Sequence, residues 1–403
     1  AIGAWVHRDG FFGSTAADGS ADNVGGGNVA FVGSGALNTL ITDDAAGGDF
    51  TVINSGSVST TVAQTYNDPV FLGTSGAPSA TTILNSVAVN FNNTLDALVA
   101  DTQSLVINAT GAGTFGDAVG NDNVGAGDSA ALVAGSGALA FLTTDRDIAA
   151  SGTTVINSTS VNTTLATGDQ IYNDAVVVGT SGAGANVTTL NGNDITFNST
   201  VDGDGVTASI EDLTVNSNGT GTTTFGDAAG DDLVGGTTPL GNLITNADGN
   251  TDINSTSVTT TADQTYNDGV IIGTSGGAAP ANLLTTLNGV NITFNKTVDA
   301  ATAGDESLLV NGSGVTTFGD AALDDNVGGG NGAFAGSGPL VNLTTDDSAA
   351  TADTTVVNSA FVTTTLDQTY NDAVTLGTSG TGNVVTTFTG NDLTFNGTVD
   401  GAA

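Results

Sequence analysis

The chain repeats one long unit four times, and this repetition limits its fold more than any other feature. Every tyrosine opens a Tyr-Asn-Asp triplet, at Tyr66, Tyr172, Tyr266 and Tyr370. An apolar run and the phrase Gly-Thr-Ser-Gly follow each triplet, starting at Gly73, Gly179, Gly273 and Gly377. A fixed long period is typical of repeat proteins, in which similar units stack into one body. We expect one continuous domain with repeats at 1–110, 111–220, 221–311 and 312–403.

The charge balance of the chain excludes several classes of function. The sequence has 41 acidic residues against 3 lysines and arginines, a formal net charge of −38. Nucleic-acid binding requires many basic residues, so we expect no nucleic-acid partner. Such an excess of negative charge makes divalent cations plausible partners. A helix that spans a bilayer needs about 18 or more apolar residues in a row, and the chain has no such run.

The residues between the turns indicate short β-strands. Runs of Val, Ile, Leu, Thr and Phe alternate with polar residues, as in 195–198, which is the period of a strand with one buried face. Gly, Asn and Asp, which suit tight turns, separate these runs. Two further phrases recur in the repeats: Thr-Phe-Gly-Asp-Ala, as at 114–118, and Phe-Asn-x-Thr-Val/Leu-Asp, as at 91–96. No segment has the spacing of a long amphipathic helix.

Two all-β architectures fit this pattern: a string of sandwiches and a solenoid of parallel strands. A sandwich needs a compact core with bulky residues, whereas this chain has one tryptophan and mostly small apolar side chains. A parallel β-helix has a narrow core that Val, Ala, Thr and Leu can fill. We therefore predict a parallel β-helix with about twenty rungs of about 20 residues. We also expect Asn and Thr to form ladders along its axis.

The two ends of the chain fall at one point of the repeat. The last residues, 398–400, match 297–299 of the third repeat. After 299 the chain continues with another strand and then Phe318-Gly319, and its first residues are a similar strand and Phe12-Gly13. Either the chain is a window on a longer protein, or copies of it stack head to tail into a fibre. An atypical N-terminal cap is the simpler alternative. If copies stack, the residues expected at the joint between them are Trp5, Val6, His7, Arg8, Phe11, Phe12, Phe395 and Val399.

The sequence contains few candidate residues for catalysis or metal binding. His7 is the single histidine, and the chain has no cysteine, so neither a nucleophile–base pair nor a zinc site is expected. Paired aspartates could hydrolyse glycosides, but these pairs recur in several repeats, whereas an active site is normally built once. We predict no catalytic residue and no cofactor. Calcium is the one candidate ligand. Its candidate residues are Asp122, Asp231, Asp232, Asp324 and Asp325. The simpler interpretation is that these aspartates are turn residues.

The phrases of the fourth repeat also resemble a known family. The segments 367–377 and 393–401, which read DQTYNDAVTLG and LTFNGTVDG, resemble the repeats of large bacterial filamentous-haemagglutinin-like and autotransporter-like surface proteins. The resemblance covers all four repeats. It implies a right-handed parallel β-helix, export to the cell surface, and a role in adhesion, matrix or sheath.

From these observations we expect a non-catalytic extracellular structural protein, a subunit or segment of a surface fibre. Its expected partners are other copies of itself, joined head to tail, and surface glycans or matrix. The first alternative is the stalk of a large surface adhesin. The second alternative is a carbohydrate-active β-helix enzyme.

Overall fold

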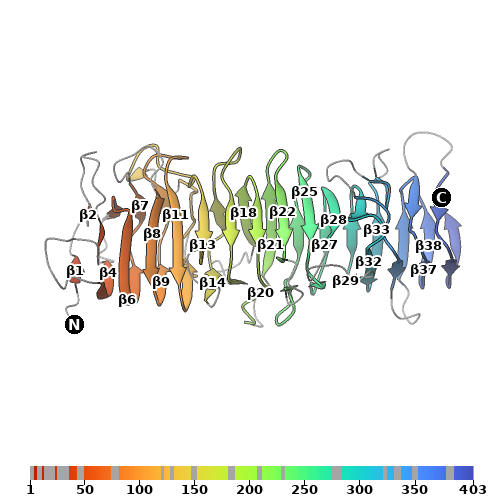
Figure 1. The fold of residues 1–403 in the computed structure, drawn as a ribbon, viewed down its shortest axis with the longest axis horizontal. Helices are drawn as coiled ribbons and strands as arrows, with labels where there is room; N and C mark the ends of the chain where they lie inside the picture. Colours follow the sequence, from red (N-terminus) through yellow and green to blue (C-terminus); the bar gives the residue numbers. More distant parts are fainter. Residues whose placement is uncertain are drawn as a thin grey trace. The chain divides into compact units, whose positions relative to one another are not determined.

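We analysed a computed structural model of the chain, in which every named element is a β-strand. The described residues are 4–6, 11–12, 23–24, 36–42, 50–73, 81–118, 122–127, 131–146, 152–179, 187–206, 211–227, 232–273, 283–320, 325–330, 337–346, 353–377 and 385–402. The chain divides into two compact units, Ala1–Phe197 with Val206–Glu211, and Asn198–Gly205 with Asp212–Ala403. Each unit is a stretch of parallel β-solenoid, and the strands can be followed in chain order by colour (Figure 1).

In the first unit the strands form three parallel ladders. Face A contains β1 (Ala4–Val6), β4 (Leu37–Thr42), the second half of β6 (Ser57–Tyr66), β9 (Ala88–Phe91), β12 (Ala112–Phe115), β14 (Thr153–Ile156) and β17 (Ala175–Val178). Face B contains β2 (Phe11–Phe12), β5 (Thr51–Ile53), β7 (Val70–Leu72), β10 (Leu95–Ala97), β15 (Ser160–Asn162) and β18 (Val187–Gly192). Face C contains β3 (Asn23–Val24), the start of β6, β8 (Thr81–Ser86), β11 (Ser104–Ala109), β13 (Leu142–Thr144), β16 (Gln170–Tyr172) and β19 (Ile195–Phe197).

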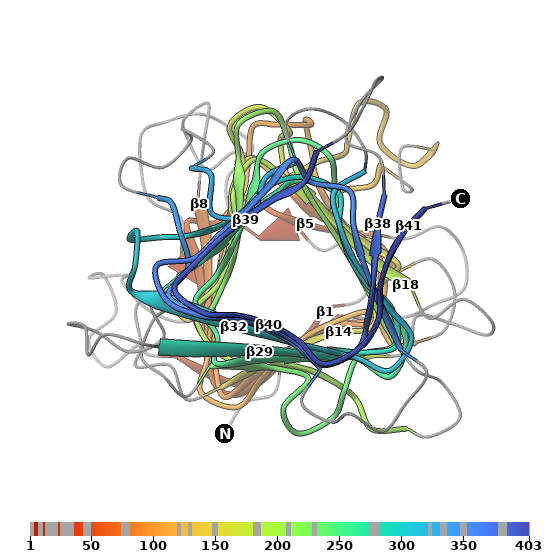
Figure 2. The ribbon, with the colours of Figure 1, turned by 90° about the vertical axis from the view of Figure 1, so that its right-hand side faces the viewer.

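The second unit has the same organisation, and its coils, in green to blue, outline a three-sided cross-section (Figure 2). Face D contains β20 (Val201–Gly203), β23 (Leu233–Val234), β26 (Ser257–Thr259), β29 (Leu283–Gly289), β32 (Glu306–Gly312), β34 (Leu343–Thr345), β37 (Gln368–Tyr370) and β40 (Leu393–Phe395). Face E contains β21 (Asp212–Ser217), β24 (Leu243–Thr245), β27 (Gln264–Tyr266), β30 (Ile292–Phe294), β33 (Val315–Phe318), β35 (Thr354–Val357), β38 (Ala373–Leu376) and β41 (Val399–Gly401). Face F contains β22 (Thr222–Phe225), β25 (Asn250–Ile253), β28 (Gly269–Ile272), β31 (Val298–Ala300), β36 (Phe361–Thr363) and β39 (Thr387–Thr389).

The predicted class, an all-β parallel solenoid, is confirmed, but the predicted twenty rungs are wrong. The two units together contain about twelve coils. Each coil is longer than the assumed 20 residues because it must supply three strands and the loops at their corners. The stacked residues Asn67 and Asn92 lie 25 positions apart, and Gly116 and Asn157 lie 41 apart.

The core lies inside the coils and in most strands consists of every second residue, whereas every residue is buried in strands such as β7, β11 and β28. In β30, Ile292 and Phe294 point inward and are fully buried, while Thr293 between them is half-buried. Burial of this apolar surface contributes about 25 cal/mol per Å². The alternation that predicted strands from the sequence is therefore the alternation between core and surface.

The three aromatic phrases occupy one position in successive coils, as one ladder in each unit shows. In the first unit the rings of Tyr66 and Phe91 stack at 5.1 Å, and those of Phe91 and Phe115 at 5.8 Å. In the second unit Tyr266, Phe294 and Phe318 stack in the same order, at 5.3 Å for each pair. Such aromatic pairs stabilise a fold by about 0.5–1.5 kcal/mol beyond their burial. The ring order Tyr, Phe, Phe therefore marks three neighbouring coils once in each unit.

The ring ladder changes face from one repeat to the next. In the first unit, Tyr66 and Phe91 belong to face A, whereas the stacked pair Tyr172 and Phe197 belongs to face C. In the second unit, Tyr266 and Phe294 lie on face E, whereas Tyr370 and Phe395 lie on face D. One sequence repeat therefore does not contain a whole number of coils, and equivalent loops of successive repeats leave the solenoid on different sides.

Candidate functional site: buried polar networks and an open sheet edge

The tyrosine of each repeat belongs to a buried hydrogen-bond network. The Tyr266 hydroxyl donates to Gln264 Oε1 at 2.9 Å, and Gln264 Nε2 donates to the Asn288 carbonyl oxygen at 2.8 Å and to the Val258 carbonyl oxygen at 3.3 Å. Both side chains are fully buried, and burial raises the pKa of Tyr266. The same tyrosine-to-glutamine bond recurs at 2.9–3.0 Å in the other repeats. The glutamine thus ties adjacent faces and coils together, and its polar atoms are satisfied by the fold itself.

The aspartate of each Tyr-Asn-Asp triplet connects neighbouring strands at a corner. Asp268 Oδ1 accepts the hydroxyls of Thr245, at 2.7 Å, and Thr251, at 2.9 Å. Burial raises the pKa of Asp268 to about 7, although both hydroxyls counteract the shift. Threonine pairs bond Asp174 and Asp372 in the same way. A perturbed carboxyl pKa can mark a catalytic group, but the raised pKa of Asp268, like that of Asp174, accompanies a structural contact.

The predicted asparagine ladders are confirmed. In the first unit Asn108 Nδ2 donates to Asn85 Oδ1 at 2.9 Å, and Asn191 Nδ2 donates to Asn162 Oδ1 at 2.7 Å. In the second unit Asn311 Nδ2 donates to Asn288 Oδ1 at 3.0 Å. These bonds run from coil to coil, so they stabilise the stacking and fix its register.

The calcium candidates that the structure describes close tight turns. The Oδ2 atoms of Asp122, Asp232 and Asp325 accept the backbone N–H groups of Asp117, Asp227 and Asp320, at 3.1, 2.8 and 3.0 Å. Burial raises the pKa of Asp122 to about 6. Asp231 and Asp324 lie outside the described residues. The described part of the chain contains no group of three or more metal-capable side chains, and calcium binding stays a prediction.

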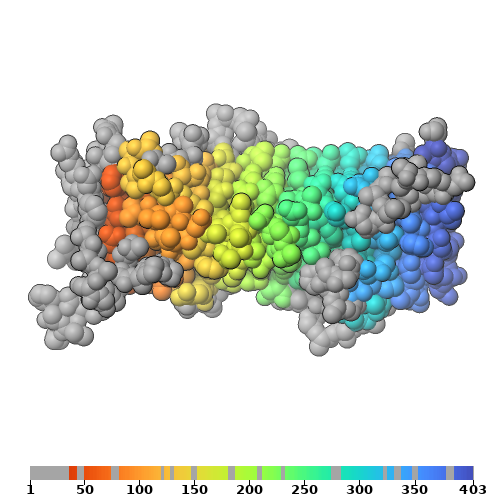
Figure 3. All heavy atoms as spheres, turned by 90° about the horizontal axis from the view of Figure 1, so that it is seen from above, coloured from red at the N-terminus to blue at the C-terminus, as the bar shows by residue number. Residues whose placement is uncertain are grey.

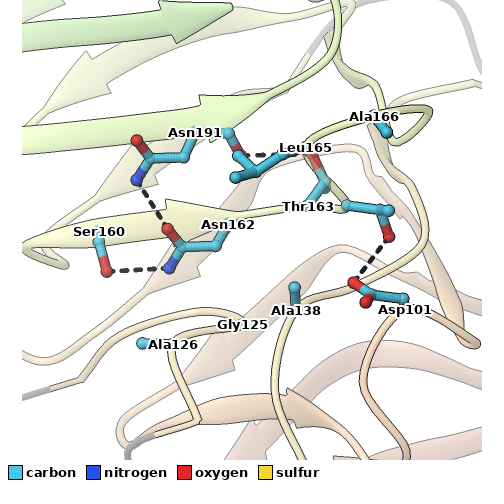
Figure 4. Close-up of a pocket in the computed structure, with 11 residues that line it drawn as sticks. Asp101, Gly125, Ala126, Ala138, Ser160, Asn162, Thr163, Leu165, Ala166 and Asn191 are labelled. Atoms are coloured by element: carbon cyan, nitrogen blue, oxygen red, sulfur yellow. Dashed lines mark hydrogen bonds between the residues drawn. The ribbon is translucent and has the colours of Figure 1, made fainter. Parts of the chain in front are cut away.

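A groove of about 770 Å³ lies on the first unit, and Figure 4 shows the residues that line it. Its floor is a segment of asparagine ladder, in which Asn162 Nδ2 donates to Ser160 Oγ at 3.1 Å and Asn191 donates to Asn162. On one wall the Thr164 hydroxyl donates to Asp101 Oδ1 at 2.9 Å. Asp101 is the single titratable residue among those that line it. The groove is therefore a polar recess whose side chains bond mainly to one another, and it offers no acid–base pair.

The last coil of the second unit presents three strands with an open side. Strands β39, β40 and β41 pair with β36, β37 and β38, and within the described residues no strand lies on their other side. The coil forms the blue end of the second unit in the space-filling view (Figure 3). Leu393 is 41% exposed and Val399 is 45% exposed, which is high for positions that are core elsewhere in the repeat. An unpaired row of backbone groups is a ready template for another strand.

The residues predicted for a joint lie on the first and last described strands. Phe395 is in β40, where its ring stacks on Tyr370 at 4.9 Å, and Val399 is in β41. Trp5 and Val6 are in β1, which pairs with β4; Phe11 and Phe12 are in β2, which pairs with β5. His7 and Arg8 lie outside the described residues. Contact between the two groups of residues stays a prediction.

No family model, curated protein or solved structure matches this chain. Among the described residues there is no helix long and apolar enough to cross a membrane. The fold alone therefore defines the class, which is a parallel β-solenoid repeat protein.

A buried carboxyl in the third repeat yields a pH-dependent prediction. Glu306 is fully buried, its Oε2 accepts the Thr302 N–H at 3.2 Å, and burial raises its pKa to about 7. The first repeat has Gln103 in this role, with Oε1 accepting the Val99 N–H at 3.2 Å. The folded state favours the protonated form of Glu306. The stability of the second unit is therefore highest below the unfolded pKa of 4.5 and falls as the pH rises through about 7.

We expect Glu306→Gln to stabilise the second unit by about 1 to 2 kcal/mol at pH 8, because solvent screens part of the full electrostatic cost. At pH 4 the same change should have little effect. Urea unfolding followed by circular dichroism at both pH values measures this difference. The reciprocal variant Gln103→Glu should lose stability at pH 8, and equal effects of Glu306→Gln at both pH values would contradict the assignment.

Proposed function

We propose that this chain is a non-catalytic extracellular structural protein, a subunit or segment of a surface fibre whose coils stack head to tail. The open side of β39, β40 and β41 is the observation that carries the proposal. The resemblance of the repeats to those of large bacterial surface proteins supports the surface location and a right-handed coil. In this proposal the repeated aspartates and glutamines stabilise the stack and have no role in catalysis.

Within the described residues, the open edge has few of the features that normally prevent strand addition. Natural edges are blocked by lysines, prolines, bulges or covering loops. Strands β39, β40 and β41 read TFT, LTF and VDG, with no proline and no basic residue, and Asp400 is their single charge. A coil placed on this edge would gain main-chain hydrogen bonds on three faces and cover the partly exposed Leu393 and Val399.

The charge of the chain sets the conditions for such assembly. Copies with a formal charge of −38 repel one another, and added salt or divalent cations screen this repulsion within a Debye length of about 8 Å at physiological ionic strength. The fibre proposal therefore predicts that assembly increases from about 10 mM to about 150 mM salt. Negative-stain electron microscopy of the 403-residue protein across this range tests it. Compact particles at every concentration and salt would refute the fibre.

Two alternative functions make different predictions for the same material. A stalk of a large adhesin requires that the native protein be far heavier than this chain, which an intact-mass measurement on native material decides. A carbohydrate-active enzyme would release reducing sugars from polysaccharides. The groove that Asp101 lines is the described recess where a sugar could lie, and an Asp101→Asn variant would test for its involvement.

A further inference from the structure

We propose that the head-to-tail joint has one defined register, in which the strands β1 and β2 of a second copy pair with β39 and β40. In this register Val6 lies opposite Phe388 and Phe12 lies opposite Phe395. The inference rests on the proposed fibre and identifies its partner as a second copy of this chain. It follows from how the same strands pair inside the two units.

The first step is the position of β1 in the repeat. Val6 pairs with Thr42, as Ile107 pairs with Thr144 in the first unit and Val310 pairs with Thr345 in the second. Strand β1 is therefore the counterpart of β11 and β32. On their other side these two strands pair with β8 and β29, with Ile107 opposite Leu84 and Val310 opposite Leu287.

The counterpart of Leu84 and Leu287 in the last coil is Phe388. Leu84 pairs with Val58 and Leu287 with Val258, while Phe388 pairs with Val362. Strand β39 therefore corresponds to β8 and β29. Its unpaired side corresponds to the side on which β8 pairs with β11 and β29 pairs with β32. Strand β1 is the counterpart of β11 and β32, which sets Val6 opposite Phe388.

The second step concerns β2 and the aromatic ladder. Phe12 pairs with Ile53, as Phe115 pairs with Ile156 and Phe318 pairs with Val357. Phe115 and Phe318 are the third rings of their ladders, opposite Phe91 and Phe294. The ladder of the fourth repeat has only its first two rings, Tyr370 and Phe395, among the described residues. In the proposed register, strand β2 of a second copy takes the place of the strand that carries this third ring in the earlier ladders.

The backbone of the edge agrees with this register. The Phe91 carbonyl oxygen accepts the Gly116 N–H at 2.8 Å, and the Phe294 carbonyl oxygen accepts the Gly319 N–H at 2.7 Å. The equivalent carbonyl of Phe395 faces the open side of β40, because β37 bonds the alternate residues, as in the bond from Asn396 N–H to the Tyr370 carbonyl.

Disulfide trapping between two variants tests the register. The equivalent pairs Leu309 with Thr286 and Thr317 with Thr293 place Trp5 opposite Thr387, and Phe11 opposite Thr394. Neighbouring strands lie about 4.8 Å apart, within the Cα separations that disulfides accept. The chain has no cysteine, so every cross-link comes from the introduced pair. We would mix Trp5→Cys with Thr387→Cys, and Phe11→Cys with Thr394→Cys.

The matched controls exchange the partners: Trp5→Cys with Thr394→Cys, and Phe11→Cys with Thr387→Cys. The register predicts at least a tenfold excess of covalent dimer in the matched mixtures on mild oxidation. Each mixture is also examined for filaments under reducing conditions, which shows that the variants fold and assemble. Filaments with equal or reversed cross-linking would overturn the register and leave the fibre standing. The absence of both filaments and cross-links, in variants and in the unchanged chain, would overturn the fibre and the register together.

Discussion

Replacing Gln264 with leucine is expected to destabilise the second unit by about 2 to 3 kcal/mol. The change leaves the Tyr266 hydroxyl without its buried acceptor and removes the Gln264 donor from the carbonyls of Val258 and Asn288, although the Asn288 carbonyl keeps the Thr260 N–H at 2.9 Å. Each buried polar group that loses its hydrogen bond costs about 1 to 3 kcal/mol. Because a solenoid is stabilised by contacts between neighbouring coils, the loss should concentrate around β27 and its neighbours.

Hydrogen exchange measured by mass spectrometry, with peptides that cover 257–300, measures this local loss. A Thr265→Ala variant, on the outward face of the same strand, is the control and should change stability by less than about 0.5 kcal/mol. Adding Tyr266→Phe to Gln264→Leu should recover about 1 kcal/mol, since the unpaired hydroxyl is then removed. If the amides of 257–300 exchange as slowly in the Gln264→Leu variant as in the Thr265→Ala control, the buried network does not stabilise the coil.

Deleting residues 1–12 is expected to abolish filaments while the remaining chain stays folded. The deletion removes β1 and β2, the two strands that the register assigns to the open edge, and the strands that follow have a different position in the repeat. Circular dichroism should show an unchanged β-spectrum, and analytical ultracentrifugation should show monomers under conditions in which the full chain assembles. A Thr293→Ala variant, changed at an outward position within the second unit, should assemble normally. Filaments of the shortened chain at the same protein concentration would contradict the joint.

The sequence predicted those features that follow from local periodicity. Alternation such as that of 195–198 marked strands with one buried face, and the lack of bulky residues favoured a solenoid over sandwiches. The ladder that includes Asn85 and Asn108 followed from stacking equal residues at equal heights. These features depend on the strand period and on repetition, both of which a sequence displays directly.

The length of a coil could not be obtained in this way. The corner loops vary, so equivalent residues can be 25 positions apart, as for Asn67 and Asn92, or 41 apart, as for Gly116 and Asn157. The three aromatic phrases were recognised as separate marks of the repeat. Their equivalence as three rings of one ladder emerges only when Tyr66, Phe91 and Phe115 are stacked in space.

The buried glutamine was the main structural residue that sequence reasoning missed. Gln64, Gln170, Gln264 and Gln368 each stand two positions before a tyrosine, and this recurrence was the available signal. A glutamine is usually exposed, so its burial depends on the neighbouring coil that supplies carbonyl acceptors. In contrast, the interpretation of Asp122 as a turn residue agrees with the hydrogen bond that its carboxylate accepts from the Asp117 backbone N–H.

Fibre diffraction from oriented filaments of the 403-residue protein tests the central claim most directly. If coils stack from copy to copy along one axis, the spacing between neighbouring strands, about 4.8 Å, must lie parallel to the filament. The account predicts a strong meridional reflection at this spacing. A strand reflection on the equator, or filaments built from globules without it, would contradict the account.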